Sequence, residues 1–255
     1  MRKSMHKNFY SFLIFLFCGY FFQLNGQELY LKDKLRKANS GDYIVTLQNK
    51  TYTFLLIDTF ASHEISLEEI TVPSQSIQLE GFSWKKWAEQ NAPGHTSWVR
   101  YVIDTTSGHI SEYFSYTKNG WYTFPEGENF LSTLLNLKLY NIPLKERRKV
   151  GPPPPSQASD RRPYWQPKLI FEGKIIPGIS FEAWRAFWPK DGSELSGKII
   201  EIYLPQVAGI YPSYFPYWLQ VSGIIGKAKI HIIDSGKGVH GRGAPAKERP
   251  LRKAG

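Results

Sequence analysis

Alternating apolar and polar positions run along the first half of the chain in short stretches. Aromatic and β-branched residues fill many of the apolar positions, which suits the pleated, half-buried surface of a sheet better than a crowded helix face. The strands predicted for this half are 43–48, 51–58, 64–72, 97–104, 109–116 and 121–124. Only Asn49-Lys50 separates the first two strands, so we predict a tight hairpin turn there.

The third predicted strand departs from simple alternation. Ile65 and Leu67 would lie on one face of an ideal strand, whereas Ile70 and Val72 would lie on the other. An extra residue in a strand shifts its alternation by one position. We therefore predict a β-bulge at Glu68-Glu69.

Three stretches have helical spacing instead. Residues 28–38 place Leu31 and Leu35 four positions apart among charged residues, which is typical of a short amphipathic helix. A second short helix is predicted to begin after Ser83, whose hydroxyl can cap its first turn. A third is predicted over 129–139, where apolar residues give a broad face for burial.

A proline-rich segment, residues 145–163, divides the chain into two parts. It contains the four consecutive prolines Pro152–Pro155, which cannot donate hydrogen bonds to a sheet and favour extended structure, so we predict a linker or an exposed loop. The strands predicted after it are 168–176, 181–188, 198–204, 217–222 and 227–234. They either form a separate domain or complete the first sheet.

We favour a single sheet, because a second part of about 75 residues has no convincing helix to cover a sheet face. The predicted fold class is therefore α+β but mainly β. It consists of one long, curved antiparallel sheet with two or three short helices, and the single domain spans residues 27–236.

The first 26 residues have the pattern of an export signal. Three basic residues precede an apolar run at 9–22, and its length of about 14 residues falls short of the roughly 20 that a membrane-spanning helix needs. Gly26 is a small residue suited to the position before a cleavage site, so the mature chain is predicted to begin at Gln27. The alternatives are an uncleaved anchor and a lipoprotein modified at Cys18.

The net charge is concentrated at the C-terminal end. The whole chain carries +10, and +7 remains after the three basic residues of the signal are removed. Residues 237–255 hold six Lys or Arg and one Glu, so about +2 is left for the body. This Gly- and Pro-rich tail is predicted to be disordered and suited to contact anionic surfaces. The body has neither the charge nor a motif for specific nucleic-acid binding.

The sequence contains few signs of catalysis. Cys18 is the only cysteine, so the cleaved chain has no thiol nucleophile, Cys-based zinc site or iron–sulfur cluster. No cofactor or metal is predicted, and Glu68 and Glu69 would point to opposite faces of their strand. The histidines of the body are His63, His95, His109 and His231. His95, in a polar loop, is the one weak catalytic candidate.

Two hypotheses for the function follow. The favoured one is a non-catalytic exported protein that stays in the periplasm or cell envelope or is secreted. It would act as a structural factor or as a carrier of an apolar ligand or partner, such as an envelope protein. Inward positions such as Tyr101 and Ile103 would then line the concave face of the sheet. The alternative is a hydrolase-type enzyme in which His95 acts with Asp104 or Ser97.

Four parts of the sequence resemble a known group of proteins. They are GDYIVTLQNKTYTFLLI, APGHTSWVRYVID, DRRPYWQPKLIFEGK with WPKDGSELSGKIIEIYLP, and FPYWLQVSGIIGKAKIHIIDSG. Through them, residues 31–236 are similar to an uncharacterised family of exported proteins from chlamydiae and related intracellular bacteria. This resemblance implies neither an activity nor catalytic residues, and the basic tail lies outside it.

Overall fold

The computed structural model describes residues 28–124, 129–155, 159–207, 209–223, 226–243 and 252–253. Within this part of the chain, the strands are β1 (Glu28–Leu29), β2 (Tyr43–Gln48), β3 (Thr51–Phe60), β4 (Glu64–Pro73), β5 (Ser97–Asp104), β6 (His109–Ser115), β7 (Gly120–Thr123), β8 (Leu139–Asn141), β9 (Leu169–Phe171), β10 (Lys174–Ile176), β11 (Phe181–Phe187), β12 (Ile199–Pro205), β13 (Trp218–Gly223), β14 (Gly226–Gly236) and β15 (Arg252–Lys253).

The helices described are α1 (Leu31–Leu35), α2 (Trp84–Glu89) and α3 (Phe130–Asn136), with 3-10 turns at η1 (Ser74–Ser76) and η2 (Leu144–Glu146). None of the described helices is long and apolar enough to cross a membrane. The predicted export signal, residues 1–26, lies outside the described residues.

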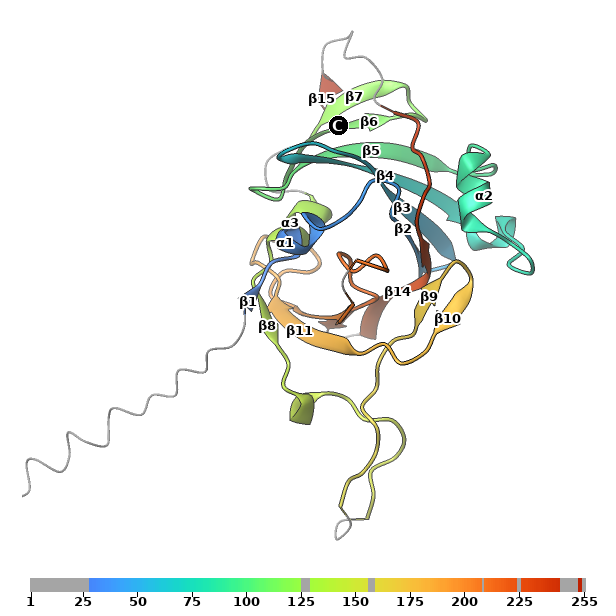
Figure 1. Cartoon of the computed structure of the whole chain (residues 1–255). Helices are drawn as coiled ribbons and strands as arrows, with labels where there is room; N and C mark the ends of the chain where they lie inside the picture. The colour runs from blue at the N-terminus through green and yellow to red at the C-terminus, as the bar shows by residue number, and fades with distance from the viewer. Residues whose placement is uncertain are drawn as a thin grey trace, which may run out of the picture.

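One curved sheet contains thirteen of these strands (Figure 1), in the order β1-β8-β11-β12-β13-β14-β2-β3-β4-β5-β6-β7-β15. Neighbouring strands are antiparallel except β15 and β7, which are parallel. Because β14 pairs with β2, the strands before and after the proline-rich segment share the sheet. The predicted mainly-β fold with a long antiparallel sheet and short helices is confirmed.

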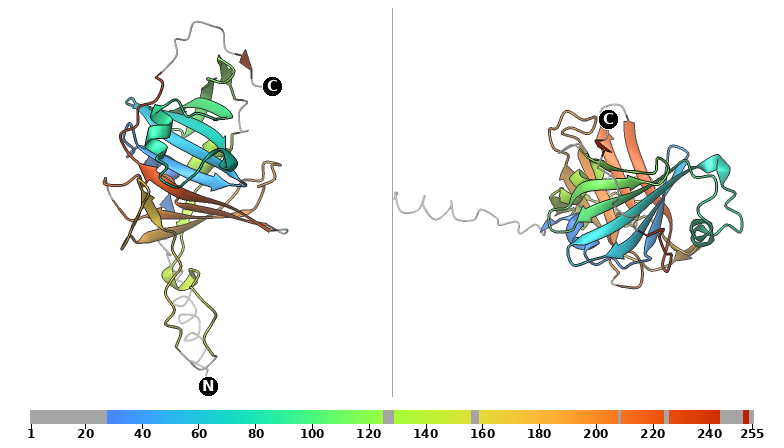
Figure 2. Two further views of the ribbon diagram at one scale, coloured as in Figure 1. Left: turned by 90° about the vertical axis from the view of Figure 1, so that its right-hand side faces the viewer. Right: turned by 90° about the horizontal axis from the view of Figure 1, so that it is seen from above.

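The inner face of the sheet curves around α1 and α3 (Figures 1 and 2). Leu31 and Leu35 of α1 and Leu135 of α3 are buried in the same apolar cluster as Trp184 of β11. The loop before β13 adds Tyr214 to this core. Side chains of the protein itself therefore fill the middle of the concave face.

The outer face is covered by α2 and by a C-terminal segment, residues 237–243 (Figure 1). Phe54 of β3 and Trp87 of α2 form an edge-to-face pair with ring centroids 6.0 Å apart. Val239 of the C-terminal segment is 1% exposed and belongs to the same apolar cluster. Both faces of strands β2 to β5 are therefore buried.

The turn and capping signals of the sequence are confirmed. Asn49 and Lys50 join β2 to β3 with positive φ values of 47° and 65°, as a tight hairpin turn requires. The Ser83 hydroxyl accepts a hydrogen bond from the Lys86 backbone N–H at 3.3 Å and caps α2. The Asn129 side chain caps α3 in the same way.

The predicted bulge at Glu68-Glu69 is wrong. Both glutamates pair regularly with β3, and the register shift lies in β3 itself, between Ile57 and Thr59. The phase change in β4 has another cause. Ile65 and Leu67 face the inner core, whereas Ile70 and Val72 lie under α2 on the outer face. The change in pattern marks a change in which face is covered.

Three element predictions are corrected in length. The first predicted helix is shorter, because residues 28 and 29 form an edge strand and only Leu31–Leu35 is helical. The third ends at Asn136, and Leu139 begins β8. The stretch 168–176 is a separate hairpin of β9 and β10, because Glu172 and Gly173 have positive φ and turn the chain.

The prediction that residues 237–255 are disordered is wrong for residues 237–243. Val239 is buried, and its backbone N–H donates to the Gly41 carbonyl oxygen at 3.2 Å. The remainder of the predicted tail lies outside the described residues, except for the two residues of β15.

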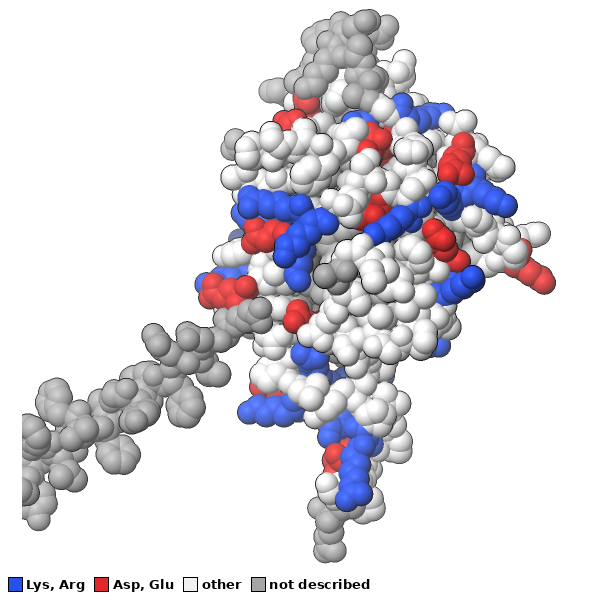
Figure 3. Space-filling view, in the orientation of Figure 1, with Lys and Arg blue, Asp and Glu red and all other residues white. Residues whose placement is uncertain are grey.

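The proline-rich segment forms an arm that projects from the sheet, defined as residues 143–155 and 159–166 (Figures 1 and 2). Its two sides are joined by an antiparallel bridge between Lys149 and Tyr164. Lys and Arg side chains are prominent on its surface (Figure 3). The segment is therefore a basic, exposed loop between β8 of the large sheet and β9 of the separate two-stranded hairpin.

Candidate functional site

The partners proposed for His95 do not assemble around it. His95 lies in a turn, where its Nδ1 is 2.8 Å from the Ala92 carbonyl oxygen and its ring packs edge-on against Trp98. Asp104 ends β5, seven residues beyond Ser97, or roughly 23 Å along an extended strand. Its carboxylate accepts a hydrogen bond from the Thr106 backbone N–H. Of the two proposed partners, only Ser97 is near His95 in the chain.

The other body histidines lie on different elements of the fold. His109 begins β6 and is exposed, while His231 of β14 is half-buried beside Trp218. Burial lowers the pKa of His231. The His63 carbonyl oxygen accepts a hydrogen bond from the Thr105 backbone N–H, which links two turns. No cluster of metal-ligating side chains occurs among the described residues.

The inner face of the sheet carries a strip of half-buried aromatic rings on β5 to β7 and the residue that follows. We call these the aromatic strip: Tyr101, Tyr113, Tyr122 and Phe124. Their ring centroids are separated by 4.6 Å for Tyr113 and Phe124 and by 5.2 Å for Tyr113 and Tyr122. The inward direction of Tyr101 and the complete burial of Ile103 agree with the alternation predicted for β5.

Two cavities flank α3 next to the aromatic strip, and we call them together the α3 groove. The first is about 290 Å³ and is lined by Ile110, Phe124 and other residues of β6 and α3. The second is about 510 Å³ and lies against Phe130 and Trp188. Thr133 of α3 lines both cavities. The concave face is therefore open beside α3.

Most walls of the α3 groove are apolar or already hydrogen-bonded. Phe130 is 43% exposed, and its ring stacks on Trp188 with centroids 5.3 Å apart. The Ser132 hydroxyl accepts a hydrogen bond from the Ile110 backbone N–H, and Asn129 caps α3. These two side chains thus serve the protein's own backbone. Asp191 and Glu194 add two carboxylates to the wall of the second cavity, and the Phe130 ring leaves aromatic surface exposed.

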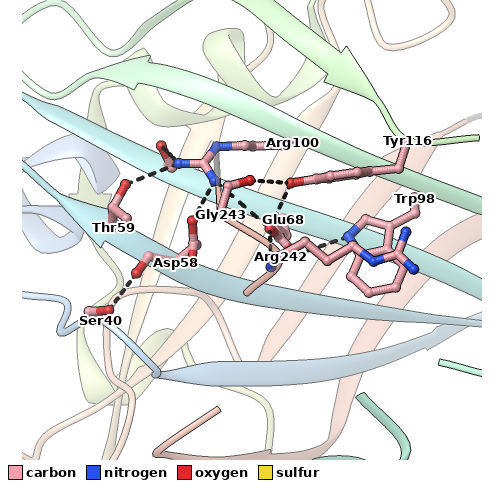
Figure 4. A network of polar contacts seen from close by, with 10 residues as sticks. Ser40, Asp58, Thr59, Glu68, Trp98, Arg100, Tyr116, Arg242 and Gly243 are labelled. Atoms are coloured by element: carbon pink, nitrogen blue, oxygen red, sulfur yellow. Dashed lines mark hydrogen bonds and ion pairs between the residues drawn. The ribbon is translucent and has the colours of Figure 1, made fainter. Parts of the chain in front are cut away.

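A second feature, a polar network, lies on the outer face of β3 to β6 (Figure 4). Arg100 of β5 is 3% exposed and makes an ion pair with Asp58 at 2.5 Å. It also donates hydrogen bonds to Ser66 at 2.7 Å and to Thr59 at 3.2 Å. Asp58 and Thr59 are consecutive, and the register shift in β3 allows both to reach Arg100.

Glu68 joins this network to the C-terminal segment (Figure 4). It is fully buried, and its carboxylate accepts hydrogen bonds from Trp98 Nε1 at 2.9 Å and from the Arg242 backbone N–H at 3.1 Å. The Arg242 guanidinium lies over the Trp98 ring, 4.2 Å from its centroid, in a cation–π contact. The Tyr116 hydroxyl lies 3.1 Å from Glu68 Oε1 and 2.8 Å from the Gly243 carbonyl oxygen.

Burial raises the pKa of Glu68, and the nearby charge of Asp58 raises it further, while the hydrogen bond from Trp98 lowers it. Burial also raises the pKa of Tyr116, with a further contribution from the charge of Glu68. Removal from water is therefore the main cause of both pKa shifts.

Part of this arrangement was predicted from the sequence. It correctly placed Glu68 and Glu69 on opposite faces: Glu68 meets Trp98 outside, and Glu69 hydrogen bonds with Tyr101 inside. It missed the approach of Asp58 and Glu68 to Arg100, because these residues come from three different strands. The sequence did contain one signal of a buried polar contact, because Arg100 is a charged residue within a strand whose neighbouring positions are buried.

One antiparallel sheet, curved around two short helices and extended by a basic arm, places the chain among mainly-β proteins built on a single sheet. The model of the CT021 protein family matches residues 53–177. The chain is therefore similar to the CT021 family over just under half of its length, and the predicted resemblance to an uncharacterised family is confirmed.

The structure is similar to the 2.0 Å structure of the hypothetical protein CT021 from Chlamydia trachomatis. The TM-score is 0.61 and the sequence identity 21%, with 86% of this chain and 99% of that chain covered. At this identity, the likeness shows a shared fold. Comparison with curated proteins found no match.

Proposed function

We propose that the protein is an exported, non-catalytic binding protein that holds an apolar ligand in the α3 groove. The observation that supports this most directly is the aromatic surface there. Phe130 remains 43% exposed beside Trp188, and the half-buried rings of the aromatic strip continue from Phe124 along the inner face. Covering such rings with an apolar ligand removes their surface from water, which is favourable.

The size of the groove fits a small ligand or one end of a longer one. Its two cavities, about 290 and 510 Å³, reach or approach the volumes of small-molecule sites. The middle of the sheet is occupied by α1, α3 and Tyr214, so the ligand would bind beside α3 and not at the centre of the concave face. An acyl chain or a hydrophobic segment of an envelope partner has the required chemistry.

Filling the groove tests this proposal. The variant Thr133→Trp places a large ring between the two cavities, and we expect it to weaken binding of the neutral fluorophore N-phenyl-1-naphthylamine at least about tenfold. Thr96→Trp is the matched control, because Thr96 is exposed and lies near Thr71 on the edge of the outer face. Equal affinities of the wild type and Thr133→Trp would overturn the proposal, provided that Thr133→Trp keeps its cooperative unfolding.

The exported part of the proposal is tested on protein recovered from the envelope of its host. We expect the recovered chain to begin at Gln27 and mass spectrometry to find an apolar molecule bound to it. Retention of Met1, or a lipid on Cys18, would contradict cleavage of the signal. A chain that carries no apolar molecule would contradict the carrier role.

A further inference from the structure

A cleft of about 450 Å³ lies between the arm and strands β11 to β13, away from the α3 groove. Its floor includes Arg185, Glu201 and Trp218, and the arm contributes Arg148 and Trp165 to its wall. The floor residues project from the face opposite to that of the inner-core residues of the same strands. We call this the arm cleft, and its volume is typical of small-molecule sites.

The three arginines of the arm cleft have different partners. Arg185 is neutralised by Glu201, with Nη2 and Oε1 2.9 Å apart, and lies 4.0 Å from Glu146. Arg147 donates to two backbone carbonyl oxygens, those of Ile142 and Phe181, each at 2.9 Å. These two bonds fix the guanidinium in place without cancelling its charge.

Arg148 is the most available cation of the arm cleft. It is exposed, and its guanidinium lies 5.6 Å from the centroid of the Trp165 ring. Within the described part of the chain, neither Arg147 nor Arg148 forms a salt bridge with a carboxylate. With three arginines and two glutamates, the cleft carries a net positive charge.

Aromatic rings line the cleft beside these charges. Trp165 packs edge-on against Trp218, with centroids 4.8 Å apart, and against Tyr203, with centroids 5.2 Å apart. Trp165 and Trp218 are half-buried, so each leaves part of its ring surface accessible. The arm thus brings an apolar ring surface next to two guanidinium groups without carboxylate partners.

We infer that the arm cleft binds a small molecule that combines a planar apolar ring with one anionic group, a carboxylate or a phosphate. The ring would pack against Trp165 and Trp218. The anionic group would accept hydrogen bonds from Arg148 and from the remaining guanidinium nitrogen of Arg147, because charged donors and acceptors form the stronger hydrogen bonds. Both the ring and the anionic group of the ligand would bind to side chains of the cleft without any change in the strands beneath.

Calorimetric titration with phenyl phosphate tests the inference, with inorganic phosphate and phenol as the two halves of that probe. We expect phenyl phosphate to bind at least about tenfold more tightly than either half. Arg148→Gln should weaken its binding about tenfold, and Trp165→Leu should remove most of the preference for phenyl phosphate over inorganic phosphate. Both variants alter exposed or half-buried positions on the arm.

Arg161→Gln is the matched control, since Arg161 is exposed on the same arm but does not line the cleft. It should leave phenyl phosphate binding unchanged. An equal loss in Arg161→Gln and Arg148→Gln would mean that the arm attracts anions only through its general charge. Phenyl phosphate that binds no better than inorganic phosphate would also overturn the inference. Neither result depends on the α3 groove, because the arm cleft and the α3 groove share no lining residue.

Discussion

Strands β2 to β5 are buried on both faces of the sheet, but different parts of the chain cover the two faces. On the inner face, Leu31, Leu35 and Leu135 of two helices share an apolar core with Trp184. On the outer face, α2 covers one end, and residues 237–243 cross strands whose side chains include Asp58, Glu68 and Arg100 (Figure 4).

The comparison shows how charged residues can be buried on one face of a sheet that is apolar on the other. Arg100 neutralises Asp58, and backbone and indole N–H groups satisfy Glu68. These groups depend on one another, because an unpaired charge away from water is costly. The inner face should therefore respond mainly to changes in side-chain volume, and the outer face to changes in charge and pH.

The largest effect should come from breaking the ion pair. Arg100→Leu leaves Asp58 and Glu68 close together without their buried cation, and we expect the free energy of unfolding at pH 7 to fall by about 3–5 kcal/mol. Urea denaturation measures this loss. Arg162→Leu is the control, because its partner Asp160 is on the surface of the arm and water screens the pair. Similar losses in both variants would contradict the buried role of Arg100.

Deleting residues 237–255 should have an intermediate effect. It exposes the pocket of Val239, whose burial contributes about 1.5–3 kcal/mol, so Tm should fall by several degrees in a thermal melt. A wholly disordered tail would instead leave Tm unchanged. The full-length double variant Val239→Ser, Arg242→Gln should reproduce most of the loss. A double variant with the wild-type Tm would show that the C-terminal segment does not stabilise the outer face.

The smallest effect should be the pH dependence caused by Glu68. Its pKa is raised above the ordinary value of 4.5, so folding favours the protonated carboxyl. This stabilisation is present below about pH 4.5 and is lost as the pH rises through the raised pKa. In Glu68→Gln, stability should therefore decline less over this range.

Asp160→Asn provides the control for pH, because hydrogen bonds from Arg162 lower the pKa of Asp160. Asp160 gives stability above its unfolded pKa that is lost on acidification, which is the opposite sign. Urea denaturation series from pH 2 to 8 would compare the two variants, because the Asp160 effect appears only on acidification below about pH 4. An unchanged pH profile in Glu68→Gln would exclude Glu68 as its source.

Local patterns predicted much of the fold, because strands, turns and caps depend on neighbouring residues. Asn49-Lys50 and Ser83 show this at a hairpin and a helix start. The order of the strands was not predictable in detail, because β14 pairs with β2 from the far side of the sequence. Likewise, no local pattern indicates that Asp58 and Glu68 share one arginine.

The glycine-rich composition of the C-terminal segment misled the prediction for a physical reason. Few apolar residues and many glycines are typical of disorder. At Gly241, however, a side-chain Cβ would collide with the carboxylate of Asp58 and come within 2.8 Å of Glu68 Oε1. The absence of a side chain lets the backbone approach these two acids. Here glycine permits close packing, and Val239 supplies the one large apolar contact.

The pairing of β14 with β2 also constrains how the chain can fold. Strands β2 to β7 are neighbours in both sequence and space, so they can assemble soon after they are synthesised. The free edge of β2, Tyr43–Gln48, stays open until the chain has been made as far as β14. An open edge can pair with another unfolded chain. Strand β2, which is central in the finished sheet, is therefore an exposed edge while the chain is being made. Aggregation competes with folding until β14 pairs with it.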